Sequence, residues 1–174
     1  MVQPSVRFIN TLIFSALLAC FATPHASAGT GVFVNGRELT RRQVAELLLT
    51  YGSVAPPDHY WYDSRSGLWG REGGEPLGFL MPGHNFGPLS PDASRGNTGI
   101  YINGRQINMV EADYLRHVLG AVYRGRWWLD GRTGDFGQEG NPVPVGNMLA
   151  AVRASQRDRS SGRVRCNPVF EGCK

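Results

Sequence analysis

Two pairs of carboxylates recur along the chain at the same spacing and are the first candidates for chemistry. The pairs are Asp63 with Glu72 and Asp130 with Glu139. Two carboxylates can act as acid and base in glycoside hydrolysis. Each Asp, however, opens an Asp-x-x-x-Gly segment in which its side chain suits a turn, and each Glu lies several residues further along. We therefore expect structural roles for all four.

The histidines and the known catalytic motifs give no second pattern. His59 stands beside an aromatic stretch, His84 lies in a Gly-rich loop and His117 falls on an expected helix. Their spacing is not typical of a metal site. The sequence contains no G-x-S-x-G, H-E-x-x-H or P-loop motif. It therefore favours a protein without catalytic residues, metal ion or cofactor.

Aromatic residues give the strongest indication of a binding surface. Sugar rings and partner side chains stack on exposed aromatic faces. In a small protein the same side chains also build the core, so we expect only part of them to be exposed. The candidate ligand-binding residues, with two neighbouring histidines, are Tyr60, Trp61, Trp69, Trp127, Trp128, His59 and His84.

These aromatics belong to an internal repeat. Residues 60–74, YWYDSRSGLWGREGG, return in altered form as WWLDGRTGDFGQEG at residues 127–140. Upstream, residues 30–40 match residues 98–108 position by position, and every difference is conservative in size or polarity. A fixed order of motifs that occurs twice indicates two copies of one structural unit.

Local signals predict the elements of each unit. Asn-Gly between apolar runs predicts hairpins at 31–39 and 99–107. The capping boxes that start at Thr40 and Asn108 predict a helix after each hairpin. The aromatic stretch with its Asp-x-x-x-Gly turn then predicts a second hairpin. The predicted fold class is α+β, with two tandem β-β-α-β-β repeats packed as a pseudo-twofold duplicated domain.

Alternation within each aromatic strand separates two faces. Successive strand side chains point to opposite sides, so the helix of a unit covers only one set. We expect the helices to cover Tyr62 and Leu129. Trp61 and Trp128 then lie on the opposite face, either between the two units or in a ligand site, and we favour the former.

The combination of a V-N-G-R hairpin with Y-W-Y-D-x-x-S-G-x-W-G resembles repeats of exported bacterial proteins that are uncharacterised. The resemblance covers residues 30–140. Because that family has no assigned activity, it implies no functional residue. The second copy departs from the motif at Phe136 and Asn141, where the first has Trp69 and Gly74.

The amino terminus indicates export. Residues 1–28 combine Arg7, an apolar run from Phe8 to Phe21 and an Ala-Ser-Ala cleavage site, as in a secretory signal peptide. The alternative is a lipoprotein acylated at Cys20, which follows Leu-Leu-Ala. The predicted location is periplasmic or extracellular, with no membrane span after cleavage.

The carboxyl terminus is basic. Residues 153–174 carry a net charge of +4, the same as the whole chain, and Cys166 with Cys173 predicts a small disulfide loop in an exported chain. The predicted segments are a signal peptide at 1–28, repeat 1 with a Pro- and Gly-rich crossing loop at 29–96, repeat 2 with a short C-terminal helix at 97–154, and a basic flexible tail with the disulfide loop at 155–174.

These features together predict a secreted or periplasmic non-catalytic binding module that uses exposed aromatics. Its ligand is expected to be an envelope polysaccharide or a protein, and the basic tail is expected to contact an anionic polymer. A structural or assembly protein of the cell envelope is the first alternative, and a small hydrolase using carboxylates or His is the second. No nucleic-acid-binding motif is present.

Overall fold

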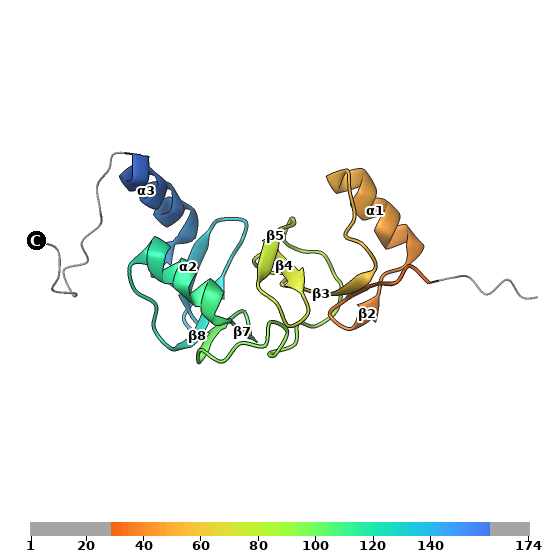
Figure 1. The fold of residues 1–174 in the computed structure, drawn as a ribbon. Coiled ribbons are helices and arrows are strands. Elements are labelled where there is room, and N and C mark those ends of the chain that lie inside the picture. Colours follow the sequence, from red (N-terminus) through yellow and green to blue (C-terminus); the bar gives the residue numbers. More distant parts are fainter. Residues whose placement is uncertain (1–28, 161–174) are drawn as a thin grey trace, which may run out of the picture.

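The computed structural model describes residues 29–160, which form two repeats that lie side by side (Figure 1). Repeat 1 is drawn in orange to yellow-green, and its helix α1 spans Arg41–Tyr51. Its strands are β1 (Val32–Val34), β2 (Arg37–Glu38), β3 (Asp58–Tyr62), β4 (Leu68–Arg71) and β5 (Pro76–Phe79). The signal peptide predicted at 1–28 and the Cys166–Cys173 disulfide lie outside the described residues.

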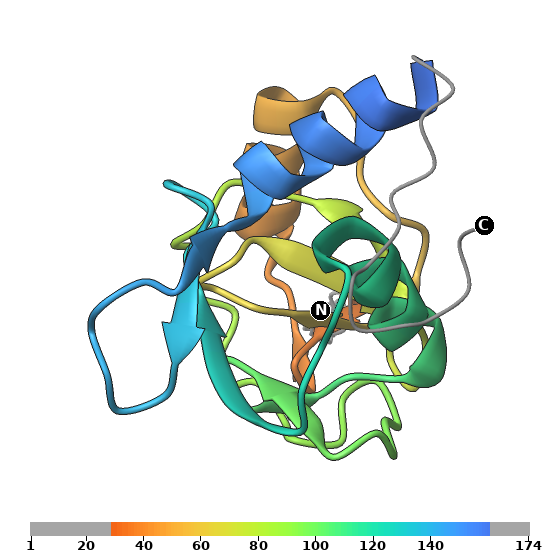
Figure 2. The same cartoon turned by 90° about the vertical axis from the view of Figure 1, so that its left-hand side faces the viewer.

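Repeat 2 is drawn in green to blue and has the same order of elements, followed by one more helix. Helix α2 spans Met109–Leu119 and α3 spans Met148–Ser160. The strands are β6 (Ile100–Ile102), β7 (Arg105–Gln106), β8 (Gly125–Leu129), β9 (Asp135–Gln138) and β10 (Gly146–Asn147). Figure 2 shows α3 running beside α2 at one end of the molecule.

Each repeat contains a five-stranded mixed sheet. The strand orders are β2-β1-β3-β4-β5 and β10-β9-β8-β6-β7. The first strand of each repeat pairs in parallel with the third, so that Val34 lies opposite Tyr60 and Ile102 opposite Trp127. The helix forms the crossover between these parallel strands, as parallel pairing requires a long connection. All other pairs are antiparallel.

The predicted hairpin turns and helix ends are present. Asn35 and Asn103 both adopt φ of 50°, and the Gly after each also has positive φ, as the Asn-Gly turn requires. Thr40 caps α1 with a complete capping box. Asn108 caps α2 by accepting from the backbone N–H of Glu111, whose side chain does not return the bond but pairs with Arg105 instead.

The sides of the two sheets divide as the sequence predicts. Tyr62 packs with Val44 and Leu47 under α1, and Leu129 packs with Leu115 of α2. Trp61, from the opposite face of repeat 1, joins the apolar cluster of repeat 2. The predicted α+β fold class with two duplicated β-β-α-β-β units is therefore confirmed.

The repeats also touch at their turns, and the contacts are not exchanged symmetrically. Asn103 Nδ2 of repeat 2 donates to Asp63 Oδ2 at 2.6 Å, whereas its counterpart Asn35 donates to the carbonyl oxygen of Gly87 at 3.1 Å. The Gly131 N–H donates to the carbonyl oxygen of Arg65 at 3.0 Å. The interface therefore uses different positions of the two copies.

Two elements differ from the sequence prediction. The segment predicted as a crossing loop is preceded by a fifth strand, β5, which pairs with β4 across a register shift between Trp69 and Gly70. The short final helix continues to Ser160, into the segment predicted as flexible from residue 155. Its Ala and Arg residues are good helix formers, and the helix packs on α2 and β9, which explains the extension.

The equivalent turn glycines Gly67 and Gly134 should respond differently to alanine. Both have φ near 80°, which costs a side chain about 1 kcal/mol. At Gly67 the added methyl group would also overlap the backbone carbonyl oxygen of Leu80, whereas at Gly134 it would meet the movable Leu149 side chain at 2.6 Å. We expect Gly67→Ala to lower the free energy of unfolding by at least about 2 kcal/mol, and Gly134→Ala by less.

Urea denaturation of the two variants measures this difference. Gly36→Ala is the control, because Gly36 has φ of 75° with no atom within 4 Å of the added carbon, so only the backbone cost of about 1 kcal/mol applies. Equal losses in all three variants would contradict the packing explanation.

Candidate functional site

The predicted ligand-binding aromatics do not form one exposed surface. Tyr60, Trp61 and Trp128 are buried, Trp69 and Trp127 are half-buried, and the two histidines differ: His59 is exposed and His84 is half-buried. Tyr60 and Trp69 meet edge to face, with centroids 5.8 Å apart, under α1. Most of the candidates therefore serve packing.

Trp61 and Trp128 have equivalent places in the two repeats. Each indole lies over a glycine of the neighbouring strand, Gly70 or Gly137. Trp61 Nε1 donates to the carbonyl oxygen of Gly74 at 3.2 Å, and Trp128 Nε1 donates to that of Asn141 at 2.7 Å. Each side chain is thus fixed by a hydrogen bond and by close contact with a glycine.

A guanidinium lies over each of these indoles. The Arg105 guanidinium carbon is 4.1 Å from the ring centroid of Trp61, and that of Arg65 is 4.8 Å from the ring centroid of Trp128. Both contacts cross from one repeat to the other. They place both Trp at the boundary between the repeats rather than on an open platform.

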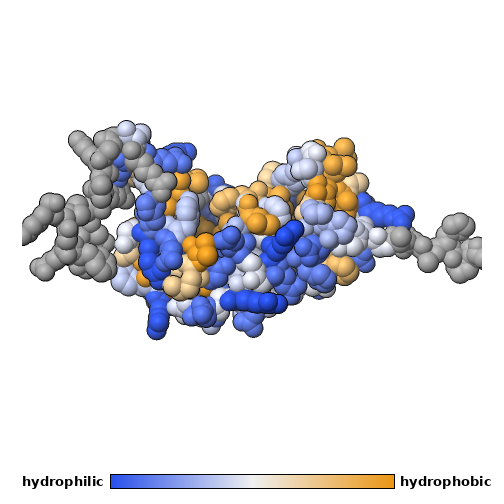
Figure 3. Space-filling model, viewed as in Figure 1, coloured by the Kyte–Doolittle hydropathy of each residue, from blue (hydrophilic) through white to orange (hydrophobic). Residues whose placement is uncertain are grey.

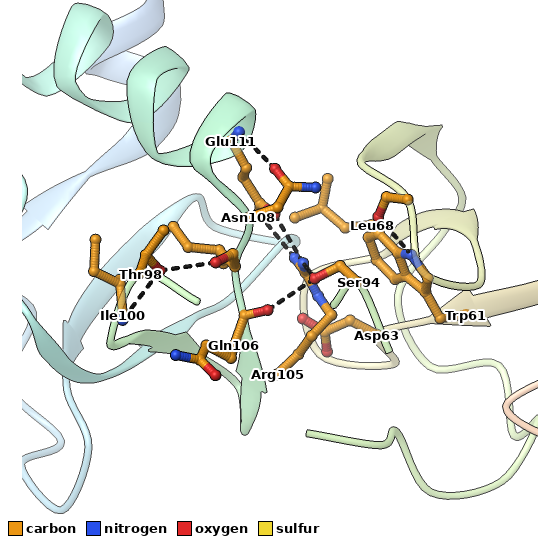
Figure 4. Close-up of polar contacts among 12 residues, drawn as sticks. Trp61, Asp63, Leu68, Ser94, Thr98, Ile100, Arg105, Gln106, Asn108 and Glu111 are labelled. Carbon is orange, nitrogen blue, oxygen red and sulfur yellow. Dashed lines mark hydrogen bonds and ion pairs between the residues drawn. The ribbon is translucent and has the colours of Figure 1, made fainter. Parts of the chain in front are cut away.

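Arg105 is the centre of a buried polar network that the sequence analysis did not find (Figure 4). Its Nη1 and Nη2 donate to the two carboxylate oxygens of Glu111 at 2.8 Å, and Nη1 also donates to Ser94 Oγ at 2.8 Å. The side chain is fully buried. Arg105 follows Asn-Gly just as Arg37 does in repeat 1, so an Arg at this position was visible in the sequence. Its partner Glu111, however, was expected to complete the capping box of α2.

The predicted carboxylate pairs do not converge. Asp63 is buried in its turn, where it accepts from Ser66 Oγ and the Arg65 N–H. Glu72 lies 3.6 Å from His59 Nδ1, and Glu139 pairs with Arg126. Each carboxylate has its own partner, so this arrangement does not pair an acid with a base.

His84 has a well-defined structural environment in the loop after β5. Its Nε2 lies 2.7 Å from Tyr51 Oη, and its ring stacks on Phe86 with centroids 5.2 Å apart. Tyr62 Oη donates to the carbonyl oxygen of Met81 at 2.6 Å, and burial raises the pKa of this hydroxyl. These contacts fix the loop over the core of repeat 1.

An open groove lies between the two repeats. It has a volume of about 660 Å³ and runs between β5 of repeat 1 and helices α2 and α3 of repeat 2. Leu77 and Phe79 on β5 are 56% and 70% exposed, and Tyr114 on α2 is 55% exposed. Figure 3 shows apolar residues along this upper side of the molecule. We call this feature the inter-repeat groove.

The charged residues that line the inter-repeat groove are all acidic. They are Glu75, Glu111 and Asp130. Glu111 is neutralised by Arg105, whereas Glu75 is exposed and Asp130 accepts a bond from the Arg132 N–H. The groove therefore combines apolar walls with negative charge. The groove was not predicted from the sequence, because its walls come from distant segments and contain none of the candidate ligand-binding residues.

Within residues 29–160, no cluster of three or more His, Cys, Asp or Glu side chains could hold a metal ion. In the same part of the chain, none of the helices has the length and apolar character needed to span a bilayer.

The fold and the groove define a small duplicated α+β module with an apolar, acidic cleft between its repeats. No known family model matches the sequence, and no solved structure matches it significantly. Extra-large guanine nucleotide-binding protein 1 of Arabidopsis thaliana is 39% identical over 114 residues, which cover 63% of this chain and 13% of that protein. Extra-large guanine nucleotide-binding protein 2 of the same plant is 38% identical over 101 residues, covering 56% and 12%.

The chain thus spans about an eighth of the length of the curated relatives it matches. These relatives correct the functional prediction from sequence, because both are guanine nucleotide-binding proteins of a plant. The prediction of a secreted or periplasmic envelope module is therefore wrong. The predicted polysaccharide or anionic-polymer partner and the predicted export, with or without acylation at Cys20, are wrong for the same reason.

Proposed function

We propose that the chain is a protein-docking module that serves guanine nucleotide-linked signalling. In this proposal the inter-repeat groove binds an extended segment of a partner protein, with apolar side chains and a flanking Lys or Arg. The observation that carries the proposal is the apolar, acidic groove itself, and the similarity to the two Arabidopsis proteins supplies the signalling context.

The edges of the two sheets support an extended partner. The charged residues Arg37 and Glu38 protect β2, the segment at Pro91 covers β7, and β10 has only two residues. Strand β5 is longer and apolar, and its Leu77 and Phe79 are exposed. An exposed apolar edge is a template for an added strand. The partner segment would pair with β5 and place alternate side chains against α2 and α3.

The charges of the groove support basic residues in that segment. Its lining includes Glu75 and Asp130 and no Lys or Arg. A Lys or Arg beside the apolar side chains would complement these carboxylates and favour the correct register.

Nucleotide binding by this chain itself is not part of the proposal. The sequence has no P-loop. A phosphate site uses free backbone N–H groups at a helix N-terminus. At α1 and α2 the side chains of Thr40 and Asn108 already accept such bonds.

Overlapping peptides from Extra-large guanine nucleotide-binding protein 1, taken outside the matched 114 residues, provide the test. Binding of each peptide to the full chain is measured by fluorescence anisotropy. At least one apolar peptide with a basic flank should bind with a Kd in the micromolar range. Leu77→Asp and Tyr114→Asp should each weaken it at least about tenfold, because they place charge on opposite walls. The affinity should also fall with added salt.

Leu49→Asp is the matched control, because Leu49 on α1 is 87% exposed and does not line the groove. This variant should bind like the wild-type chain. Absence of any binding peptide, or an equal loss in the control, would overturn the proposal. Saturable binding of GDP or a GTP analogue would replace it with a nucleotide-binding function.

A further inference from the structure

A second apolar pocket lies in repeat 2, between α2 and the face of the sheet that this helix covers. Its volume is about 370 Å³. Its walls include Leu119, Trp127, Phe136 and Val145, and it shares Ile102, Leu115, Leu129 and Met148 with the inter-repeat groove. We call it the repeat-2 pocket.

Repeat 1 has the equivalent positions and fills the space between them with its own chain. Tyr60, Tyr62 and Trp69 correspond to Trp127, Leu129 and Phe136. After β5 the chain crosses this site, and Phe86 is buried there with its ring centroid 5.2 Å from that of Tyr62. Repeat 1 therefore contains an example of what such a pocket accepts: an aromatic ring on a non-helical segment.

The two repeats differ in the course of the backbone immediately after an equivalent hydrogen bond. The Leu80 N–H donates to the carbonyl oxygen of Gly67 at 2.8 Å, and the Met148 N–H donates to that of Gly134 at 2.7 Å. Repeat 1 then continues to His84 and Phe86, whereas repeat 2 enters α3. Met148 thus takes the place of Leu80, but in repeat 2 no residue up to Ser160 follows it as Phe86 follows Leu80.

We propose that Phe170, in the carboxyl-terminal segment of this same chain, fills the repeat-2 pocket. The segment Asn167-Pro168-Val169-Phe170-Glu171-Gly172 resembles Pro82 to Gly87 in having a Pro before the Phe and a Gly after it. Each Phe thus comes after the last strand or helix of its repeat. A Gly, which permits a sharp turn, follows each Phe within two residues.

The chain is long enough for this return. Helix α3 starts at the pocket with Met148 and carries the chain about 18 Å away by Ser160. The ten residues from Ser160 to Phe170 reach up to about 34 Å when extended. Arg163 and Arg165 on this path complement the acidic residues of the adjoining inter-repeat groove.

Hydrogen–deuterium exchange of the full chain tests this inference without any partner protein. We expect the backbone of α2 and β8 to exchange at least about fivefold faster in Phe170→Ser than in the wild-type chain, because an unfilled pocket opens more readily. Val164→Ser, which removes an apolar side chain from the same segment, is the control and should leave exchange unchanged. Both variants should keep the wild-type melting temperature to within a few degrees.

A synthetic peptide of residues 161–174, added to the Phe170→Ser chain, should restore protection, whereas the same peptide with Ser at 170 should not. Equal exchange in Phe170→Ser and wild-type chains would overturn the proposal. Protection of the wild-type chain that rises with protein concentration would also overturn it, because the occupant would then come from a second copy. These measurements use no partner peptide, so their outcome can be distinguished from that of the peptide-binding test.

Discussion

Arg105→Met should lower the free energy of unfolding by about 3–5 kcal/mol, since it leaves a buried carboxylate without its partner. Glu111 is nearly as buried as Arg105, and its two carboxylate oxygens accept from both terminal guanidinium nitrogens of Arg105. The substitution also removes the cation over Trp61. Methionine fills much of the same volume, so the loss reports the charge rather than a cavity.

A double variant separates the ion pair from the packing. Arg105→Met with Glu111→Leu should recover most of the lost stability, because a buried ion pair is roughly equivalent to apolar residues of similar size. Arg37→Met is the matched control, since Arg37 occupies the same position in repeat 1 but is exposed. Urea denaturation gives the free energies. A double variant as unstable as Arg105→Met would show that the pair itself determines the structure of the interface.

Trp61→Ala should lower the free energy of unfolding by about 3–5 kcal/mol, the usual effect of removing a large buried aromatic side chain. Trp61 is only 1% exposed and packs into the apolar cluster of repeat 2. The change also removes the hydrogen bond from its indole nitrogen to the Gly74 carbonyl oxygen and uncovers Gly70. The collapse of neighbouring side chains into this space is limited, because Arg105 is held by Glu111.

Tyr123→Ala provides the control for an aromatic outside the core, because Tyr123 is mostly exposed. It should change stability by less than about 0.5 kcal/mol. Thermal and urea denaturation measure both variants, and iodide should not quench Trp61 in the folded chain. A stable Trp61→Ala variant, together with strong quenching, would show that this Trp belongs to an open binding surface.

Local signals were sufficient for much of the fold. Asn-Gly at residues 35–36 and 103–104 requires positive φ, so both hairpins followed from sequence. Thr40 and Gly52 defined the ends of α1 in the same way. The parallel pairing of β1 with β3 did not follow, because it depends on where the crossover helix packs and not on residues near the strands.

The site was harder to predict because its parts are distant in sequence. Strand alternation separated Tyr62 from Trp61, but only the fold shows that Arg105 covers Trp61. Glu111 fits the pattern of a capping box, and the buried guanidinium competes for it more strongly than the backbone does. The inter-repeat groove depends on β5, which runs into the Pro- and Gly-rich segment that was predicted as an irregular crossing loop.

Trp61 and Leu68 are encoded in the first repeat, yet they complete the apolar core of the second. A fragment that begins at residue 97 would lack the largest side chain of its own core and would expose the apolar residues that it covers. Loss of structure in either half therefore removes support from the other, which favours melting of residues 29–160 as one cooperative unit. A transfer of this module into another protein should therefore keep both repeats together.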